Sequence, residues 1–548
     1  MSSRPFALAL LLLAGLTPSL AEAVTVIRFG RIDFDDERVA FLPNGTSSWG
    51  SRKTTSMTAA PLAGALVVAR WWCTASSQGE VRVNASTDGI WVFAEDLPCS
   101  LPWLRLDVRF ESHPDGDPTS NPFHAVVAPS ELGYFARTPW ARPATGSWVS
   151  VNVSCPNQFP NTGQPCTATN AATHEAANIH ATVMDVIAVW GAYRGPNDAP
   201  LLEIRYPAST AGTNATGNYD RVNLPDQSYV ENHRIAHELG HTYMKRAIYD
   251  GNRAVGGPST WVSGHTWNDT RIGVGDPNGL FSSQNGPNDC DINATTFADN
   301  CELAPLGDRY PDGNNDGYSE TVATSEGWAD FFAAATYFEP NANHPYFRHC
   351  RTIDGCPSLP AYGAADPSNQ ELRRLEGETF AHYRYLTSGF EQCVGVGPTN
   401  FAVVDRNNNV DINWQHALQG NVARYFWDLY DEDVDANGNG VDDDCPRLVS
   451  GVVTPAACER PGVVDNVVFP PSYMLLVWER FRPTYDNRDY DEPRATPSTW
   501  DDPDGRNAVD YRKIEAAIPA ADIPAEVRGH GQAAGEFSAN CLDGQDEG

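Results

Sequence analysis

The chain has 548 residues, and its 38 Lys+Arg and 70 Asp+Glu give it a formal net charge of −32 at pH 7. This charge argues against nucleic acid and anionic lipid as partners, because both are bound through basic faces. Hydrophobic residues make up 41% of the sequence and charged residues 20%, which predicts a globular protein and not a disordered one. The length predicts more than one domain.

The N-terminus predicts export. Arg4 precedes an apolar run over residues 6–16, and Ala21-Glu22-Ala23 matches the A-x-A cleavage pattern of a secretory signal peptide. We expect cleavage near Ala23, so that residues 1–23 are removed and the mature protein is secreted. The alternative is a buried N-terminal helix. No later stretch approaches 18 apolar residues, which predicts a protein without a membrane span.

Export changes the interpretation of the 12 cysteines. No C-x-x-C motif occurs, so a cysteine zinc site is disfavoured and disulfide bonds are expected in an oxidising compartment. Local pairing is a hypothesis, because connectivity does not follow from sequence alone. The pairs close in sequence are Cys73 and Cys99, Cys155 and Cys166, Cys290 and Cys301, Cys350 and Cys356, and Cys445 and Cys458, with Cys393 and Cys541 left over.

Residues 24–168 are expected to be rich in β-strands. Residues 66–69, 81–84, 104–110 and 148–153 form short runs that are apolar or alternate with period two, as half-buried strands do. Clusters of Gly, Pro and Asn separate these runs. They predict a β-sandwich-like region that serves as an accessory region or a pro-region.

From residue 169 the apolar pattern becomes helical. Helices are expected over residues 171–190, 228–243, 320–338, 413–430, 473–481 and 509–518. Ser228 and Glu231 match an S-x-x-E capping box at the start of the second helix. Residues 201–206 are expected to form a strand, which is either an edge strand that binds an extended peptide or a purely structural one.

These elements predict a multidomain fold class. A β-sandwich-like region is followed by an α+β domain over residues 169–440 and by a loop-rich C-terminal extension over residues 441–548. Residues 250–318 are dominated by Gly, Asn, Asp and Pro, and they are expected to form a loop insertion in the α+β domain.

The second helix carries the sequence His237-Glu238-Leu239-Gly240-His241, an H-E-x-x-H motif. Residues four apart lie on the same helix face, so the two imidazoles can bind one zinc ion. Glu238 then lies beside the open coordination position, where it can act as general base on a zinc-activated water. By the same geometry His233 lies about 80° from His241 around the helix, so we interpret it as a polar neighbour and not as a ligand.

A catalytic zinc site needs a third protein ligand. Glu326 and Asp330 are again four residues apart, on a helix whose aromatic residues and alanines predict burial. Because buried acids need partners, Glu326 is the expected third ligand. Asp330 would accept a hydrogen bond from a ligating histidine and so fix its orientation. The alternative is that both acids simply face water.

The two motifs resemble those of the gluzincin class of metallopeptidases. The stretch Glu326-Gly327-Trp328-Ala329-Asp330-Phe331 is especially similar to the E-G-W-x-D-F stretch of fungalysin-type peptidases, which are relatives of thermolysin. The resemblance implies a zincin-like catalytic domain in which His237, His241 and Glu326 bind zinc, Glu238 is the general base and Asp330 supports a ligand. His241 and Glu326 are 85 positions apart, farther than in these families, so residues 250–318 are expected to be an insertion beside the cleft.

Two acidic segments resemble parts of calcium-binding loops, with side-chain oxygens at alternate positions and a glycine for the turn. The first has Asp312, Asn314, Asp316 and Glu320 at these positions. The second has Asp435, Asn437, Asn439 and Asp443. Neither is a complete EF-hand loop, and the alternative for each is an acidic turn in water. The first precedes the Glu326 helix directly, so calcium there would hold that helix in place.

These observations predict a secreted, calcium-stabilised zinc metallopeptidase that acts on a protein or peptide substrate. One alternative is a catalytically degenerate zincin that serves as an extracellular binding protein. Another is a zinc hydrolase of non-peptide amides or esters, because the H-E-x-x-H motif specifies activation of water and not the acyl group that is attacked.

Overall fold

A computed structural model describes much of the chain, with gaps. The described residues are 24–40, 51–52, 59–75, 77–130, 132–144, 146, 148–153, 168–196, 198–208, 214–215, 220–226, 228–248, 317–340, 346–350, 370–374, 403–404, 410–411, 419–430, 446–449, 452–455, 467–484 and 508–531.

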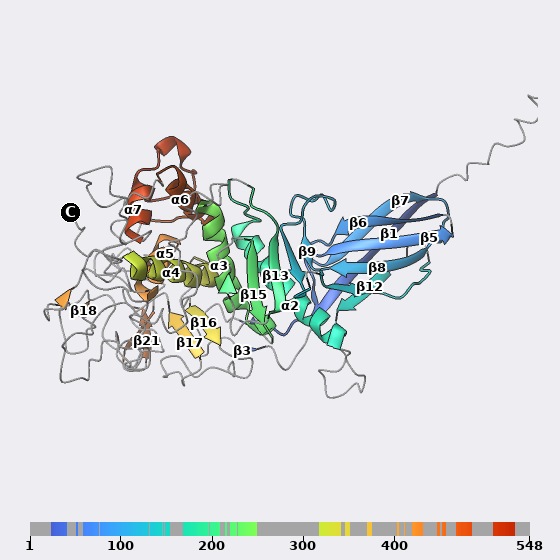
Figure 1. Cartoon of the computed structure of the whole chain (residues 1–548), viewed down its shortest axis with the longest axis horizontal. Helices are drawn as coiled ribbons and strands as arrows, with labels where there is room; N and C mark the ends of the chain where they lie inside the picture. Colours follow the sequence, from blue (N-terminus) through green and yellow to red (C-terminus); the bar gives the residue numbers. More distant parts are fainter. Residues whose placement is uncertain are drawn as a thin grey trace, which may run out of the picture. The chain divides into compact units, whose positions relative to one another are not determined.

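The described part of the chain contains six α-helices and several β-sheets, so the mixed α and β class that the sequence predicts is confirmed at this coarse level (Figure 1). The chain divides into two compact units. Unit 1 comprises residues 1–35, 59–122 and 134–174, and unit 2 comprises residues 36–58, 123–133 and 175–548. The predicted domain boundaries stay predictions.

Unit 1 contains two sheets. In one, β1 (Val24–Asp35) pairs with β4 (Ala59–Pro61), β7 (Ile90–Leu97) and β12 (Trp148–Val153). The other has the order β11-β8-β5-β6, with β11 (Phe135–Arg137), β8 (Trp103–Arg109), β5 (Leu66–Thr74) and β6 (Ser77–Asn84). Unit 1 also holds the short strand β9 (Glu111–Ser112). All four strands predicted in this region lie in or overlap observed strands.

The pattern of alternation explains which strands of unit 1 could be predicted. In β8, Leu104, Leu106 and Val108 are buried at alternate positions, as the period-two pattern requires. Strand β1 was not predicted, because its buried face includes Arg28 and Gly30 among apolar residues. Gly30 is needed there, since a Cβ atom at this position would overlap the backbone carbonyl of Val149 on β12.

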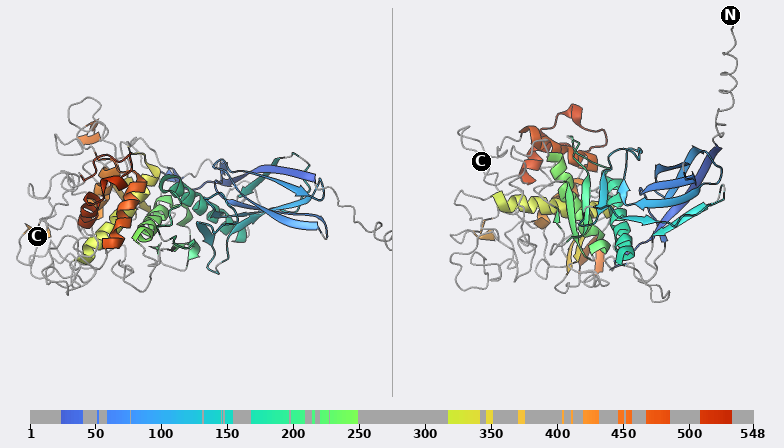
Figure 2. Two further views of the ribbon diagram at one scale, coloured as in Figure 1. Left: turned by 90° about the horizontal axis from the view of Figure 1, so that it is seen from above. Right: turned by 45° about the vertical axis from the view of Figure 1, so that its right-hand side comes forward.

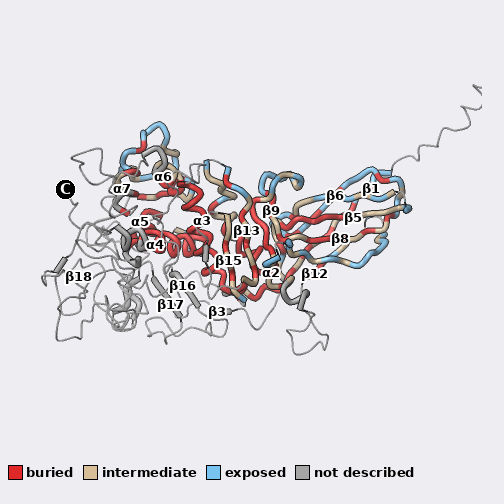
Figure 3. Tube along the Cα trace, in the orientation of Figure 1, coloured by how far each residue is buried: buried red, intermediate tan, exposed pale blue. Residues whose placement is uncertain are grey.

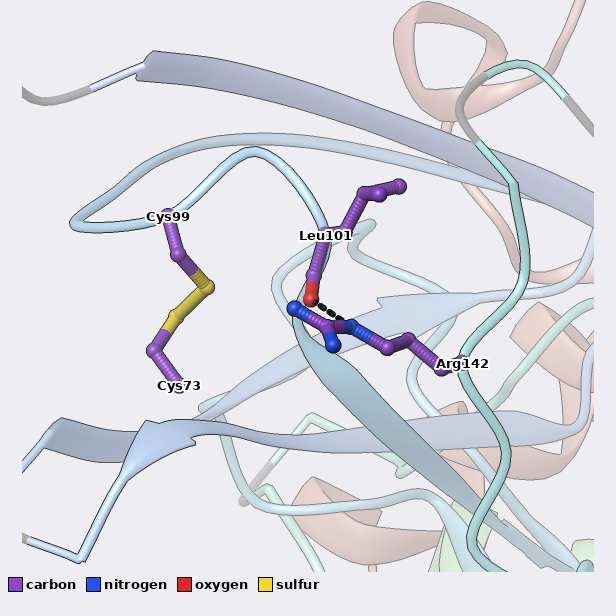
Figure 4. Close-up of a disulfide and its surroundings, with 4 residues drawn as sticks. All are labelled: Cys73, Cys99, Leu101 and Arg142. Carbon is purple, nitrogen blue, oxygen red and sulfur yellow. Dashed lines mark hydrogen bonds between the residues drawn. A yellow bond between two sulfur atoms is a disulfide. The ribbon is translucent and has the colours of Figure 1, made fainter.

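A disulfide bond joins Cys73, at the end of β5, to Cys99, with the two Cα atoms 5.9 Å apart (Figure 4). This is one of the local pairs that the sequence predicts. Beside it, Arg142 Nε donates a hydrogen bond of 2.7 Å to the carbonyl of Leu101 (Figure 4). The side chains of the other cysteines lie outside the described part of the chain.

Unit 2 contains a sheet with the order β14-β15-β13-β10. Strand β13 (Leu202–Ala208) runs parallel to both β10 (His124–Val127) and β15 (Arg221–Pro225), and β14 (Asn214–Ala215) is antiparallel to β15. The predicted strand at residues 201–206 corresponds to β13. Because β13 pairs on both sides, it is not an edge strand. Of the two alternatives that the sequence leaves open, the edge strand that binds an added peptide is therefore wrong, and the purely structural strand remains.

The six described helices correspond to the six predicted ones. They are α2 (Ala168–Trp190), α3 (Asn232–Ile248), α4 (Gly317–Tyr337), α5 (Gln419–Tyr430), α6 (Pro471–Thr484) and α7 (Ala508–Ala516). In unit 2, α4 packs against α3 and α5, and α6 packs against α3 and α7 (Figure 2). Aromatic rings fill this helical core: Trp328 of α4 contacts Phe426 of α5 and Trp478 of α6, with ring centroids 5.1 and 5.5 Å apart.

The start of α3 differs from the prediction. Residues Ser228–Val230 form a 3-10 turn, η1, and the α-helix begins at Asn232. The Ser228 hydroxyl donates to the carbonyl of Pro225 (2.7 Å), and the Glu231 N–H donates to the carbonyl of Ser228 (3.0 Å). The N–H that the capping box assigns to the serine hydroxyl is thus already used by a backbone carbonyl, so the predicted capping box is wrong.

The remaining described elements are short. They are β2 (Val39–Ala40), β3 (Ser51–Arg52), β16 (Tyr346–Cys350), β17 (Gln370–Arg374), β18 (Val403–Val404), β19 (Val410–Asp411), β20 (Pro446–Val449), β21 (Val452–Pro455) and the 3-10 turn η5 (Ala520–Asp522). The strands pair β2 with β3, β16 with β17, β18 with β19 and β20 with β21. Across the described ranges, no helix has the length and apolar character that crossing a membrane requires.

Candidate metal centre

Helix α3 supplies the H-E-x-x-H residues from the interior of unit 2. Every residue of this helix is buried (Figure 3). His237 and His241 are 4% and 6% exposed, and they lie one turn apart on the same face. A polar side chain that is buried this deeply must be hydrogen-bonded or paired, or it destabilises the fold. The partners of both histidines come from α4.

Two residues allow α3 and α4 to approach closely. A Cβ atom at Gly240 would lie only 3.0 Å from both the Cα of Ala329 and the Cβ of Phe332 on α4. Glycine at the fourth position of the HELGH sequence therefore lets the helices pack at this distance. The indole N–H of Trp328 donates to the carbonyl of Gly240 (3.1 Å), which also fixes the position of α4 along α3.

The structure brings His237, His241 and Glu326 together. His237 Nε2 lies 3.0 Å from Glu326 Oε2, and His241 Nε2 lies 3.1 Å from Glu326 Oε1. The two Nε2 atoms are 3.2 Å apart. Within the described ranges, these three residues form a group whose ligand atoms all lie within 4.8 Å of one another.

The donor set of this group fits a divalent transition metal. Two imidazoles and one carboxylate are ligands that zinc binds at about 2.0–2.2 Å, and ligands around a tetrahedral zinc lie about 3.3 Å from one another. The three distances of 3.0, 3.1 and 3.2 Å are close to this value. Because different oxygens of Glu326 face the two histidines, one carboxylate spans both nitrogens.

The second nitrogen of each histidine is held by α4. Asp330, which is fully buried, accepts a hydrogen bond of 2.8 Å from His237 Nδ1. Ser325 Oγ lies 3.0 Å from His241 Nδ1. With both Nδ1 atoms engaged in this way, both Nε2 atoms face the carboxylate of Glu326, which is the ring orientation that a shared metal ion would need.

The two histidines differ in basicity because their partners differ. Burial lowers the pKa of His237, but hydrogen bonds and charges of Asp330 and Glu326 outweigh burial and raise this pKa to about 10. For His241, burial is the largest effect, and its pKa is lowered despite the attraction of Glu326. Asp330 raises the pKa of His237, whereas the like charge of His237 adds to burial in lowering the pKa of His241, and together these effects account for the asymmetry.

Glu238 lies in the same buried region, with 7% of its surface exposed. Two cationic side chains of α3, Arg234 and Lys245, interact with its charge. Burial lowers the pKa of Arg234 and of Lys245, and the charge of Glu238 opposes both shifts. Lys245 also interacts with Glu326. Neither cation was predicted, although their spacings from Glu238, four residues before and seven after, place both on its side of the helix.

Other predicted residues lie elsewhere. His233 is buried and packs against the rings of Tyr337 and Phe338, with centroids 5.1 and 6.2 Å away, and it is not part of the metal-binding group. Ser325 was not predicted. Its position directly before the third ligand is the signal that could have identified it.

The calcium motifs stay predictions. Of the first motif, Glu320 lies in α4, but its side chain is outside the described part of the chain, as are Asp312, Asn314 and Asp316. The second motif, Asp435 to Asp443, also lies outside the described residues.

Comparisons with protein-family models, with curated proteins and with solved structures give no match.

Proposed function

We propose that this protein is a secreted zinc-dependent metallopeptidase of the gluzincin class, which hydrolyses peptide bonds. The observation that carries the proposal is the convergence of His237, His241 and Glu326 from helices that are far apart in sequence. The contacts of Asp330 and Ser325 also support the metal site. They hold both histidines with Nε2 toward the carboxylate of Glu326, and a purely structural ion pair would not need this orientation of both rings.

In this proposal, three residues of the site hold the metal and one residue transfers a proton. His237, His241 and Glu326 would hold zinc, which supplies Lewis acidity and lowers the pKa of a water from about 15.7 toward 7. Glu238 accepts the proton of the attacking water on its carboxylate. It then donates this proton to the nitrogen of the leaving amine, which completes the cleavage of the amide bond.

Two neighbouring side chains keep the ligands in place. Asp330 and Ser325 fix the rings of His237 and His241 through their Nδ1 atoms. Lys245 and Arg234 offset the negative charge of the carboxylates that gather around α3.

The proposal extends to the domain organisation of the chain. We propose that the α3–α4 pair belongs to a zincin-like domain, and that the two sheets of unit 1 form a β-sandwich-like accessory region or pro-region. Calcium at the Asp312 and Asp435 motifs would stabilise the ligand helix α4 and the C-terminal region. The signal peptide supports secretion, and the mature enzyme would begin near Val24.

The experiment that tests the proposal compares Glu238→Gln with the wild-type protein. The expected result is one bound zinc per chain in both proteins by elemental analysis, and hydrolysis of a generic protein substrate such as casein by the wild type alone, with at least a 1000-fold loss in the variant. Glu526→Gln, at an exposed glutamate, is the matched control and should keep full activity.

Each other outcome contradicts a specific part of the proposal. A wild-type protein without bound metal would overturn the site. Metal without turnover of any peptide would favour a catalytically degenerate binding protein. Turnover of esters or non-peptide amides without cleavage of proteins would favour a hydrolase of another class.

A further inference from the structure

One face of the β11-β8-β5-β6 sheet in unit 1 carries arginines and tryptophans in register. Leu104 and Leu106 of β8 are buried on the opposite face, and the alternation of the strand turns Trp103 and Arg105 the other way. In the antiparallel pairing with β5, Arg70 is the partner of Arg105 and Trp72 is the partner of Trp103. Like charges directly opposite each other destabilise a sheet, so this pair of arginines needs a compensating negative charge.

A single buried carboxylate serves three of the guanidinium groups on this face. Asp107 is 2% exposed and accepts two hydrogen bonds from Arg137, of 2.6 and 2.9 Å. Its oxygens also lie 3.7 Å from Arg70 Nε and 3.8 Å from Arg105 Nε. At these distances the two arginines gain charge attraction but no hydrogen bond, and neither Nε atom has a hydrogen-bond acceptor.

The face is locally cationic in an acidic protein. Glu80 on β6 contacts Arg82 at 2.9 Å and Arg70 at 3.6 Å. The arginine cluster, defined as Arg70, Arg82, Arg105 and Arg137, is thus balanced by only two carboxylates, Glu80 and Asp107. Arg109 at the end of β8 has its own carboxylate, Glu111, at 3.9 Å. Among the described residues of this sheet, the arginine cluster therefore keeps a surplus of two positive charges, whereas the chain as a whole has a charge of −32.

Aromatic rings adjoin the arginine cluster. Trp72 and Trp103 stack with ring centroids 5.7 Å apart, and Trp140 meets Trp72 edge to face at 6.4 Å. The guanidinium of Arg105 lies 4.8 Å from the centroid of Trp140, whose exposed fraction is 40%. Such cation–π contacts hold the guanidinium in a fixed orientation beside an exposed ring.

The surrounding backbone holds this face rigid. The Cys73–Cys99 disulfide directly follows Trp72 and ties the end of β5 to the segment that leads into Trp103 (Figure 4). Leu104 and Ala141 exchange two backbone hydrogen bonds, of 2.7 and 2.9 Å, which fix the segment that carries Trp140. A binding face that is ordered before its ligand arrives loses less entropy on binding.

We propose that this aromatic–arginine face binds an acidic polysaccharide, a chain of sugar rings that carry carboxylate groups. Guanidinium groups pair with carboxylates in a planar, two-point geometry. The exposed indole beside them offers an apolar surface to the C–H face of a sugar ring. A sheet face suits an extended polymer, since small ligands are bound in concave pockets.

The net charge of the whole molecule argues against a densely charged polymer such as DNA as the ligand. Double-stranded DNA carries one negative charge per about 1.7 Å and is bound through many phosphate contacts. A surplus of two positive charges on a protein of charge −32 is too small for such a ligand. A carboxylated glycan carries fewer charges per unit length and adds apolar ring surface, and both properties match this face.

The test measures binding of the full-length protein to polygalacturonate by affinity gel electrophoresis, with neutral dextran for comparison. The wild type is expected to be retarded by polygalacturonate and not by dextran. Arg70→Ala/Arg105→Ala and, separately, Trp140→Ala should each weaken retardation at least tenfold. Arg31→Ala removes an arginine that is 39% exposed and lies on the other sheet of unit 1, so this control should bind like the wild type.

Several results would overturn the proposal. They are no retardation of the wild type, no effect of either variant, and an equal loss in Arg31→Ala. Equal affinity for polyglutamate or for a single-stranded oligonucleotide would overturn the assignment to a sugar polymer. If the double arginine variant does not fold, as judged by circular dichroism, Trp140→Ala decides alone. Glu238→Gln should bind normally, which separates this face from the proposed hydrolase.

Discussion

At the scale of single residues, the two histidines of the candidate metal site depend on unequal partners. Asp330 brings a full negative charge to His237, whereas Ser325 brings a neutral hydroxyl to His241. Outer contacts of this kind fix ring orientation and basicity, and their loss typically weakens metal binding 10–100-fold. The contribution of the Ser325 hydroxyl to metal affinity can therefore be measured without an activity assay.

We expect Ser325→Ala to lower the affinity for zinc by about tenfold, because the His241 ring then loses the partner of its Nδ1 atom. Ser325→Thr keeps the hydroxyl and should restore most of the affinity. Competition with a chromophoric chelator measures both values. Equal affinities of the alanine variant and the wild type would show that Ser325 does not position His241.

The individual ligands could be predicted because helical geometry is local. Spacings of four residues identified the pair His237 and His241, and likewise the pair Glu326 and Asp330, without knowledge of how the helices pack. The positions of Ser325 and Lys245 on their helices also follow from spacing, but their partners do not. The contacts of Ser325 with His241 and of Lys245 with Glu326 join α3 and α4, and helical spacing within one segment does not specify which faces of two helices meet.

At the scale of elements, the contact between α3 and α4 sets the geometry of the site. Each helix supplies part of the metal-binding group, so any change in their separation moves His237 and His241 relative to Glu326. Gly240 lies in this contact, and a single added methyl group there tests how closely the two helices must pack.

We expect Gly240→Ala to destabilise the protein by about 1–3 kcal/mol, because the added Cβ would lie 3.0 Å from backbone and side-chain atoms of α4. Zinc affinity should fall as well, although no ligand is changed. Gly133→Ala is the matched control, since its Cβ would meet nothing within 4 Å, and its effect should stay within about 0.5 kcal/mol. Urea denaturation measures both, and equal stabilities would contradict the packing argument.

The elements themselves were predictable where a single periodicity dominates. Helices α2 to α7 and the strands β5, β6, β8 and β12 follow from apolar spacing. Strand β1 did not, because Arg28 and Gly30 interrupt its apolar face, and the capping box failed because a backbone carbonyl took the N–H in question. In each case a contact with a distant or competing group overrode the local pattern.

At the scale of the whole molecule, the disulfide bond and the proposed metal site lie in different units. The Cys73–Cys99 disulfide lies in unit 1, and the metal-binding group lies in unit 2. Each unit has a buried apolar core, with Val67 and Leu106 in the first and Leu239 and Phe332 in the second. We therefore expect calorimetry to resolve two unfolding transitions that respond to different treatments.

Removal of zinc with a chelator should lower only the transition of unit 2. A metal at 1000 times its dissociation constant stabilises the folded state by about 4 kcal/mol, and readdition of zinc should restore the transition in the wild type but not in Glu326→Ala.

The variant Cys73→Ala/Cys99→Ala should instead lower only the unfolding transition of unit 1. Its two cysteines are 26 positions apart, and closure of a loop of this size stabilises by about 3 kcal/mol. A chelator that shifts both transitions equally, or a cysteine variant that lowers zinc affinity, would contradict the separation of the two units.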